Sequence, residues 1–326
     1  MSVCLVTPTW HGDLHHFQML RRSLRRYGLD HVPHIVVVHT EDRDEFCRLE
    51  SGGMRVMTTS EVLPADVEHG RVLCARRNRG DGSRRAKLFR SVSKRFGLFR
   101  WANYYGWQVQ QITKLYVPLS VDYDVCVVLD SDLILCGPLE VEEFLTGGRA
   151  QLVEKRTVIT PDRDRHVCRW AKTAHQLLGE PYRPLEPINY RTDTPVVLDR
   201  EVIGALHAEV QKRHGAALHE VLLKLKPMSW SEFLLYNVFA ERFVGTRLER
   251  RACAQGLKEI CIESGASRLN AARLIRLAFE SPDIRLLRIV SEARDRARWT
   301  GAEFERHIGP YMAMSDTAAV ASDTRQ

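Results

Sequence analysis

Two carboxylates interrupt an apolar stretch of the chain. The run Val125–Leu129 is followed by Asp130, Ser131 and Asp132, and apolar residues resume at Leu133. Residues two apart in a strand point to the same side, so the two aspartates are expected to converge. Like charges are costly to bury unless a cation neutralises them, and Mg²⁺ or Mn²⁺ typically bridges carboxylates to substrate phosphates. The spacing predicts a divalent-metal site; the alternative is two acids in a solvated loop.

Alternating strand and helix patterns in the first third predict the sheet that positions these acids. Apolar runs at 3–7, 34–39 and 54–57 are typical of strands, and apolar residues recur at helical spacing over 14–27. This order predicts a parallel, doubly wound sheet, in which ligands bind beyond the carboxyl ends of the strands. The residues expected to share that rim with the acidic pair are Thr7, Pro8, Thr9, Thr40 and Glu41.

The rest of the chain continues the α/β pattern. Strands are predicted over 151–153 and 195–198, and helices over 107–119, 166–178, 200–226, from 230 onward, 269–279 and 284–299. Ser231 and Glu232 would begin the helix that follows Trp230, where backbone N–H groups favour an anionic ligand.

The net charge of +7 comes from one segment. Residues 71–100 contain eleven lysines and arginines and one acid, Asp81, so the remainder of the chain is slightly acidic. Such a patch predicts an anionic partner such as phosphate groups, a lipid surface or a charged glycan; the alternative is a solvated loop running into an Arg-rich helix. Nucleic acid is not expected, because no known binding motif accompanies the patch.

Several classes of protein are disfavoured by what the sequence lacks. No apolar run approaches the roughly 20 residues of a membrane span. Residues 1–6 enter a strand directly, without the pattern of a signal peptide. The eight cysteines form no CxxC pair, which disfavours a zinc knuckle or a thioredoxin motif. We expect a cytoplasmic, reduced protein.

Four pieces of the chain together resemble GT-A glycosyltransferases. They are residues 6–9 (VTPT), 106–115 (GWQVQQITKL), 129–132 (LDSD) and 231–236 (SEFLLY). The run of motifs is similar to a poorly characterised bacterial branch of that fold, grouped as a domain of unknown function, over roughly residues 3–240. The resemblance implies a single GT-A (Rossmann-like) α/β domain with a mostly parallel central sheet flanked by helices. It also implies transfer of a sugar from a UDP- or GDP-linked donor with the help of Mn²⁺ or Mg²⁺.

The same resemblance suggests a domain organisation. The catalytic domain would span 1–245, with a nucleotide-binding half over about 1–140 and an acceptor half over about 141–245. A C-terminal helical extension over 246–314 and a disordered tail over 315–326 would follow.

The resemblance also assigns the metal and phosphate contacts. Asp132 would ligate the metal directly, and Asp130 would share the metal or bond the ribose hydroxyls. Lys114 would neutralise phosphate or hold the donor sugar, because charge develops on the departing diphosphate.

The nucleotide and the donor sugar would be held by residues of the rim and of the 107–119 helix. Thr7, Pro8 and Thr9 would cradle the nucleotide with backbone groups, and Glu41 would lie near the base or ribose. Gln110 and Gln111 would bond sugar hydroxyls.

Three residues are candidates for the remaining roles, each with a structural alternative. Glu232 is the candidate general base for an inverting transfer, or an acid that complements a helix dipole. Asp193 is similar in placement to donor-sugar residues of retaining enzymes, or is an ordinary turn aspartate. His307 is the candidate third metal ligand, although most single histidines are not ligands.

The expected acceptor is a glycan or a lipid-linked glycan in bacterial polysaccharide or glycoconjugate synthesis. The 71–100 segment and the basic C-terminal helices would contact an anionic membrane, at its inner face. Three other functions remain open: a phosphatase of the haloacid-dehalogenase type, a nucleotidyltransferase, and a catalytically silent nucleotide- or glycan-binding module on the same scaffold. The first usually carries its Asp-x-Asp near the start of the chain, and the second a Gly-rich basic loop after the first strand.

Overall fold

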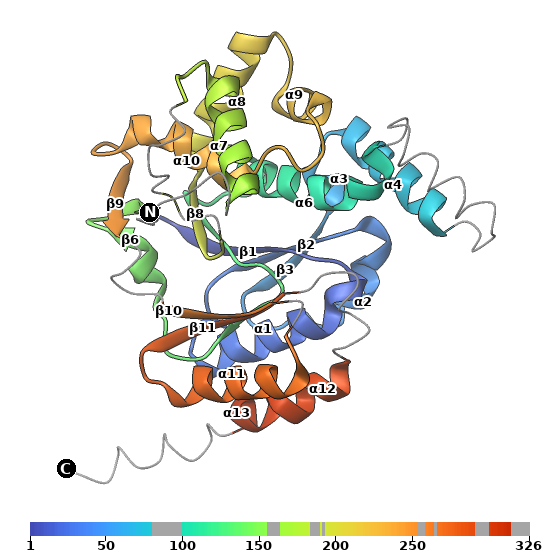
Figure 1. Ribbon diagram of the computed structural model, residues 1–326, viewed down its shortest axis with the longest axis vertical. Helices are drawn as coiled ribbons and strands as arrows, with labels where there is room; N and C mark the ends of the chain where they lie inside the picture. Colours follow the sequence, from blue (N-terminus) through green and yellow to red (C-terminus); the bar gives the residue numbers. More distant parts are fainter. Residues whose placement is uncertain are drawn as a thin grey trace.

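A mostly parallel sheet of five strands lies at the centre of the molecule (Figure 1). The computed structural model describes residues 1–79, 100–154, 164–182, 190, 193–252, 258–263, 266–290 and 300–313. The strand order is β3 (Met54–Thr58), β2 (His34–Val38), β1 (Val3–Pro8), β4 (Val125–Val128) and β8 (Val196–Asp199). The first four strands of this order run parallel, and β8 pairs with β4 in the antiparallel direction. The predicted α/β class is confirmed.

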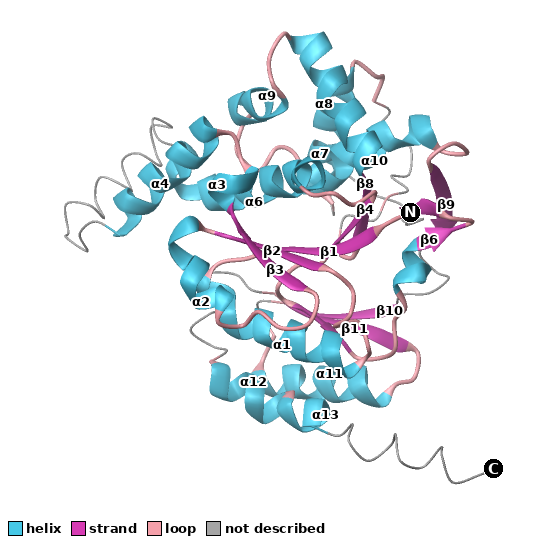
Figure 2. Ribbon diagram, turned by 180° about the vertical axis from the view of Figure 1, so that it is seen from behind, coloured by secondary structure: helices cyan, strands magenta, loops and turns pink. Residues whose placement is uncertain are grey.

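Helices cover both faces of this sheet (Figures 1 and 2). All residues of β2 and β4 are buried, as expected for strands sandwiched between helical layers. One layer contains α3 (Thr59–Val62), α4 (Ala65–Arg79), α6 (Arg100–Ser120), α7 (Arg165–Leu178), α8 (Arg200–His214), α9 (Leu218–Lys224) and α10 (Glu232–Ala240). On the other face lie α1 (Leu14–Arg26) and α2 (Arg43–Cys47), followed by α11 (Arg268–Glu280), α12 (Gly301–His307) and α13 (Gly309–Ala313).

The C-terminal part contributes strands as well as helices. One small sheet has the order β10 (Lys258–Ile262), β11 (Ile284–Ile289) and β5 (Leu133–Leu135), and a second contains β6 (Leu145–Thr146), β7 (Arg149–Glu154) and β9 (Leu248–Ala252). The helix predicted over 284–299 is therefore wrong at its start, because residues 284–289 pair with β5 and β10. Residues 291–299 lie outside the described residues.

Three strands of the central sheet end at one edge. Pro8 pairs with Val37, and Val6 pairs with Val128, so β1, β2 and β4 finish nearly level. The hydrogen bond from Thr9 N to Val37 O (2.9 Å) continues the ladder one residue past β1. The common rim predicted from the sequence is therefore formed.

Part of the basic segment lies beyond what the structure describes. Residues 71–79 belong to α4, and 80–99 lie outside the described residues, as does the tail 315–326. Among the helices that are described, none is long and apolar enough to cross a membrane.

Candidate active site

The acidic pair lies on a turn between two sheets. β4 ends at Val128, and Leu133 N donates a hydrogen bond to Asp130 O (3.1 Å) across the turn. Asp132 O accepts from Ile289 N (3.0 Å), which fixes the far side of the turn to β11. The prediction that a strand aligns the two carboxylates is wrong in this detail, because the turn, anchored by a different sheet on each side, positions them.

Lys114 lies between two carboxylates from distant parts of the chain. Its Nζ forms an ion pair with Asp130 Oδ1 at 2.8 Å and donates a hydrogen bond to Glu232 Oε1 at 3.1 Å. The side chains of Lys114 and Glu232 are buried, whereas Asp130 is 26% exposed and so faces solvent on one side. Lys114 Nζ also lies 4.7 Å from the centre of the Phe233 ring. The geometry brings together three residues that the sequence predicts for donor and catalytic roles.

Burial and charge oppose each other at this triad, and charge prevails. Burial alone would lower the pKa of Lys114, but the charges of Asp130 and Glu232 raise it above its ordinary value. Burial alone would raise the pKa of Asp130, but the charge and the hydrogen bond of Lys114 lower it below its ordinary value. The lysine is therefore an ammonium and Asp130 a carboxylate at neutral pH.

The turn that precedes β8 contacts Asp130 from another side. Thr194 Oγ1 donates to Asp130 Oδ2 (3.2 Å) and accepts from Asp130 N (3.3 Å). Asp193, the neighbouring residue of this turn, accepts a hydrogen bond at its Oδ1 from Arg288 Nη1 (3.1 Å). The sequence does not predict a role for Arg288, which lies on β11, because the pattern of residues 284–299 favours a helix.

Several buried side-chain polar atoms of the described residues have no hydrogen-bond partner. Within the described residues these include Thr9 Oγ1, Gln111 Oε1, both amide atoms of Gln108 and Trp230 Nε1. A buried group left unsatisfied costs about 1–3 kcal/mol, so native proteins usually satisfy such groups with water or ligand. Gln111 shares the Lys114 face of α6, while Gln110 is half-buried. Two residues predicted for the donor site, Thr9 and Gln111, therefore have unused hydrogen-bonding capacity.

Glu41 is already engaged by a cation. Both of its carboxylate oxygens accept from Arg71, at 3.0 and 2.7 Å, and the hydrogen bonds of Arg71 lower the pKa of Glu41 to about 2. Arg71 is buried and also bonds Glu68 on its own helix. The role of Glu41 beside a base or ribose stays a prediction, and Arg71 ties α4 to the end of β2.

The donor atoms around the turn suit a hard divalent cation. Among the described residues, ion pairs and longer-range attraction link the charged side chains around the turn. Two are cations, Lys114 and Arg288, and five are carboxylates: Asp130, Asp132, Asp193, Glu232 and Glu259. Carboxylate oxygens and an excess of negative charge are what Mg²⁺ and Mn²⁺ bind. The described residues hold no group of three or more His, Cys, Asp or Glu side chains placed to chelate a metal. His307 ends α12, and its role as a third ligand stays a prediction.

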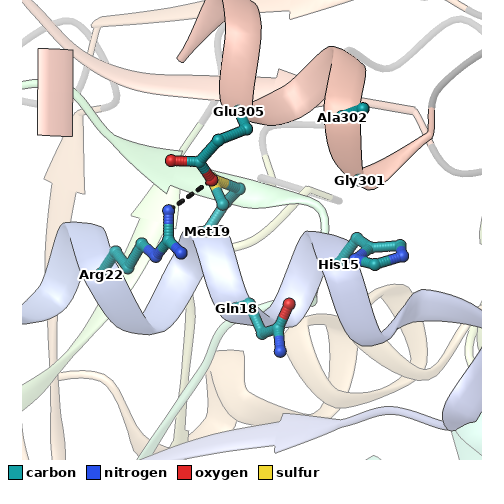
Figure 3. A pocket seen from close by; sticks show the side chains of 7 residues that line it. All are labelled: His15, Gln18, Met19, Arg22, Gly301, Ala302 and Glu305. Carbon is teal, nitrogen blue, oxygen red and sulfur yellow. Dashed lines mark hydrogen bonds and ion pairs between the residues drawn. The ribbon is translucent and has the colours of Figure 1, made fainter. Parts of the chain in front are cut away.

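A separate cavity of about 400 Å³ lies between α1 and α12 (Figure 3). An exposed ion pair between Arg22 and Glu305 (2.6 Å) crosses it, and His15 packs against Gly301. None of the predicted site residues lines this cavity. Its one arginine, Arg22, is paired with Glu305.

Comparison with known proteins gives a family match and several similar folds. The model of a family described as "Family of unknown function (DUF6492)" matches residues 1–263. No curated protein sequence matches the chain.

Several solved structures of sugar-transferring enzymes are similar to this chain in fold. The galactosyltransferase LgtC, in complex with donor and acceptor sugar analogues, is 11% identical, with 94% of this chain and 95% of that chain covered and a TM-score of 0.44. Mouse xyloside xylosyltransferase 1 is 10% identical, with 90% and 99% covered and a TM-score of 0.43. Core-mannan synthase A of Aspergillus fumigatus, in its Mn/GDP form, is 9% identical, with 77% and 72% covered and a TM-score of 0.42. At these identities and scores, the function has to be argued from the residues of this chain.

Proposed function

The chain belongs to DUF6492, a family of unknown function, and we propose that it is a metal-dependent glycosyltransferase that uses a nucleotide-sugar donor. One observation carries the proposal. Asp130 and Asp132 lie on a turn at the carboxyl edge of a parallel sheet. The buried ammonium of Lys114 contacts both Asp130 of this turn and Glu232. This arrangement supports the proposal of a site for a cation and its phosphate ligands, beside a second carboxylate that would serve the acceptor.

The donor would be bound along the rim. Asp132 and Asp130 would hold Mn²⁺ or Mg²⁺, and the ion would supply positive charge to the diphosphate of a UDP- or GDP-linked sugar. The backbone after β1, from Thr7 to Thr9, would contact the nucleotide. The unsatisfied Oε1 of Gln111 supports a role in bonding a sugar hydroxyl.

The transfer breaks the bond between the anomeric carbon of the sugar and the diphosphate oxygen. That oxygen leaves with the bonding electron pair, and an acceptor hydroxyl oxygen forms the new bond to the anomeric carbon. The hydroxyl proton must go to a base, and the Glu232 carboxylate is proposed for this step. Lys114, fixed by two carboxylates, stabilises the negative charge that develops on the leaving diphosphate without having to reorganise.

The acceptor is proposed to be a glycan, displayed on a lipid at the cytoplasmic face of a bacterial membrane. The charge of the 71–100 segment supports this proposal, although Arg71 itself is buried in its pairs with Glu41 and Glu68. Sedimentation with vesicles that contain anionic lipid tests it: binding should fall as salt rises, and an absence of binding at low salt would refute it.

A thermal-shift screen tests the proposed activity. UDP, GDP and their sugar conjugates are added with and without Mn²⁺, and at least one should raise the Tm only when the metal is present. Asp132→Asn should lose this shift and keep the melting temperature of the unliganded protein. If no nucleotide gives a metal-dependent shift, the transferase proposal fails. A shift without sugar transfer or donor hydrolysis would favour the silent binding module.

A further inference from the structure

We propose that Arg288 is a positioning residue that holds the 193–194 turn against Asp130. It would thereby make the C-terminal sheet part of the metal site. The inference rests on the proposed function in one respect, because the carboxylate that Arg288 steadies is a proposed metal ligand. Arg288 lies beyond residues 1–263, the part of the chain that the family model matches.

The guanidinium of Arg288 bonds two consecutive residues of that turn. Its Nη1 donates to Asp193 Oδ1 at 3.1 Å, and its Nη2 donates to the backbone oxygen of Thr194 at 2.9 Å. A planar guanidinium with two fixed donors can hold a side chain and a backbone oxygen at once, which a single ammonium does less well. The turn is therefore fixed in both position and orientation.

The other face of the turn contacts the proposed metal ligand. Thr194 Oγ1 donates to Asp130 Oδ2 at 3.2 Å and accepts from the backbone N–H of Asp130 at 3.3 Å. A hydroxyl has one proton, so this pattern fixes its direction toward the carboxylate. Arg288 thus acts on Asp130 through Thr194.

Arg288 is itself well anchored. It lies on β11, where it pairs with Leu133, the residue after Asp132, and its Nη2 lies 3.1 Å from Glu259 Oε1 on β10. Its side chain is 12% exposed. Burial lowers the pKa of the guanidinium, but the surrounding carboxylates, Glu259 and Asp193 first, raise it above the ordinary value. The strand, the charge and the burial keep Arg288 in one position.

Charge and geometry predict opposite effects of removing Arg288. If the residue acts only through its charge, its loss makes the acidic turn more negative and strengthens Mn²⁺ binding. If it acts by positioning, its loss frees the 193–194 turn and weakens binding, by about 10- to 100-fold for hydrogen-bonded partners of metal ligands. Whether the affinity for Mn²⁺ rises or falls when Arg288 is removed therefore distinguishes a role through charge from a role through positioning.

Electron paramagnetic resonance of free Mn²⁺ measures this affinity without any reaction. The full chain is titrated with Mn²⁺ alone, with Mn²⁺ and UDP, and with Mn²⁺ and GDP. The variants are Arg288→Gln, which removes charge and donors, and Arg288→Lys, which keeps the charge and loses the fork. Arg285→Gln is the matched control, because Arg285 is on the same strand and bonds Glu143 and Pro138 O instead of the 193–194 turn.

Positioning predicts at least about 10-fold weaker Mn²⁺ binding for Arg288→Gln, an intermediate loss for Arg288→Lys and no change for Arg285→Gln. Thr194→Val should weaken binding as well, and the double variant with Arg288→Gln should lose little more than the larger single loss, because both act on Asp130 along one path. Melting curves establish that each variant folds. If Arg288→Gln does not fold, Arg288→Lys decides the question, and wild-type affinity in it overturns the inference.

Two results would contradict the inference in distinguishable ways. Equal or tighter Mn²⁺ binding by Arg288→Gln overturns the positioning role and leaves the metal site in place. If the wild type binds no Mn²⁺ under any of the three conditions, the proposed metal-dependent function fails and the inference fails with it.

Discussion

Replacing Lys114 by methionine should destabilise the protein strongly and in a pH-dependent way. Methionine keeps most of the length and apolar volume of the lysine side chain and removes its charge. The carboxylates of Asp130 and Glu232 would then lose the ammonium that contacts them at 2.8 and 3.1 Å. Glu232 is buried, so water cannot fully replace the lysine.

The size of the effect follows from the burial of the pair. Removing one partner of a buried ion pair costs about 3–5 kcal/mol. With an unfolding entropy of about 2.1 cal/mol/K per residue, a chain of 326 residues loses about 4–7 °C of Tm for that cost.

The effect should shrink as the pH falls. In the wild type, the lysine lowers the pKa of Asp130, so the carboxylate contributes stability above its unfolded pKa and loses it as the pH drops through the folded value. In the variant, burial still raises that pKa, the Arg288 charge and the Thr194 hydrogen bond still lower it, and the lowering by Lys114 is lost. The pKa of the variant carboxyl therefore lies above its wild-type value, so the gap to the wild type narrows as the pH is lowered from 7.5 to 5.5.

Thermal unfolding followed by circular dichroism, with EDTA present, measures the gap at both pH values. Lys258→Met is the matched control, because Lys258 forms an exposed pair with Asp283 and its loss should leave the Tm unchanged. If Lys114→Met melts within about 1 °C of the wild type at pH 7.5, a shift below that expected for a lost buried pair, the account of the triad is wrong.

Three further predictions concern Arg71, His34 and Glu232. Arg71→Gln should let the pKa of Glu41 rise from about 2 toward 4.5 and should lower the Tm; carbon NMR of the carboxyl group checks this, and an unchanged titration would contradict it. Burial lowers the pKa of His34 to about 3, so its imidazole should stay neutral at pH 5, and nitrogen NMR that shows titration near pH 6.5 would refute this. Glu232→Gln should lower kcat by about 10²-fold or more and keep the metal-dependent nucleotide shift; wild-type kcat would exclude Glu232 as the base.

The central sheet could be predicted because its signals are local. Apolar runs bounded by helical periodicity identify β1, β2 and β4, and parallel order then places the residues after them on one rim. The acidic pair was identified for the same reason. The geometry of the turn that carries this pair could not be predicted. It depends on β5, the strand after the turn, which pairs with β11 instead of joining the central sheet.

The contacts within the site could not be predicted, because they join distant residues. Lys114 and Glu232 were each singled out, but no sequence pattern shows that residues 118 positions apart share a hydrogen bond. Arg288 was missed for a different reason. The sequence of residues 284–289, IRLLRI, fits a helical face as well as a strand, and the pairing with β5 decides between them.

A crystal structure with Mn²⁺ and a nucleoside diphosphate would show whether the turn of Asp130 and Asp132 holds a metal ion. We expect an anomalous difference peak for manganese at about 2.1 Å from a carboxylate oxygen of Asp132, with the diphosphate bound to the same ion and close to Lys114. A nucleotide bound elsewhere, or a manganese peak away from the turn of Asp130 and Asp132, would contradict it.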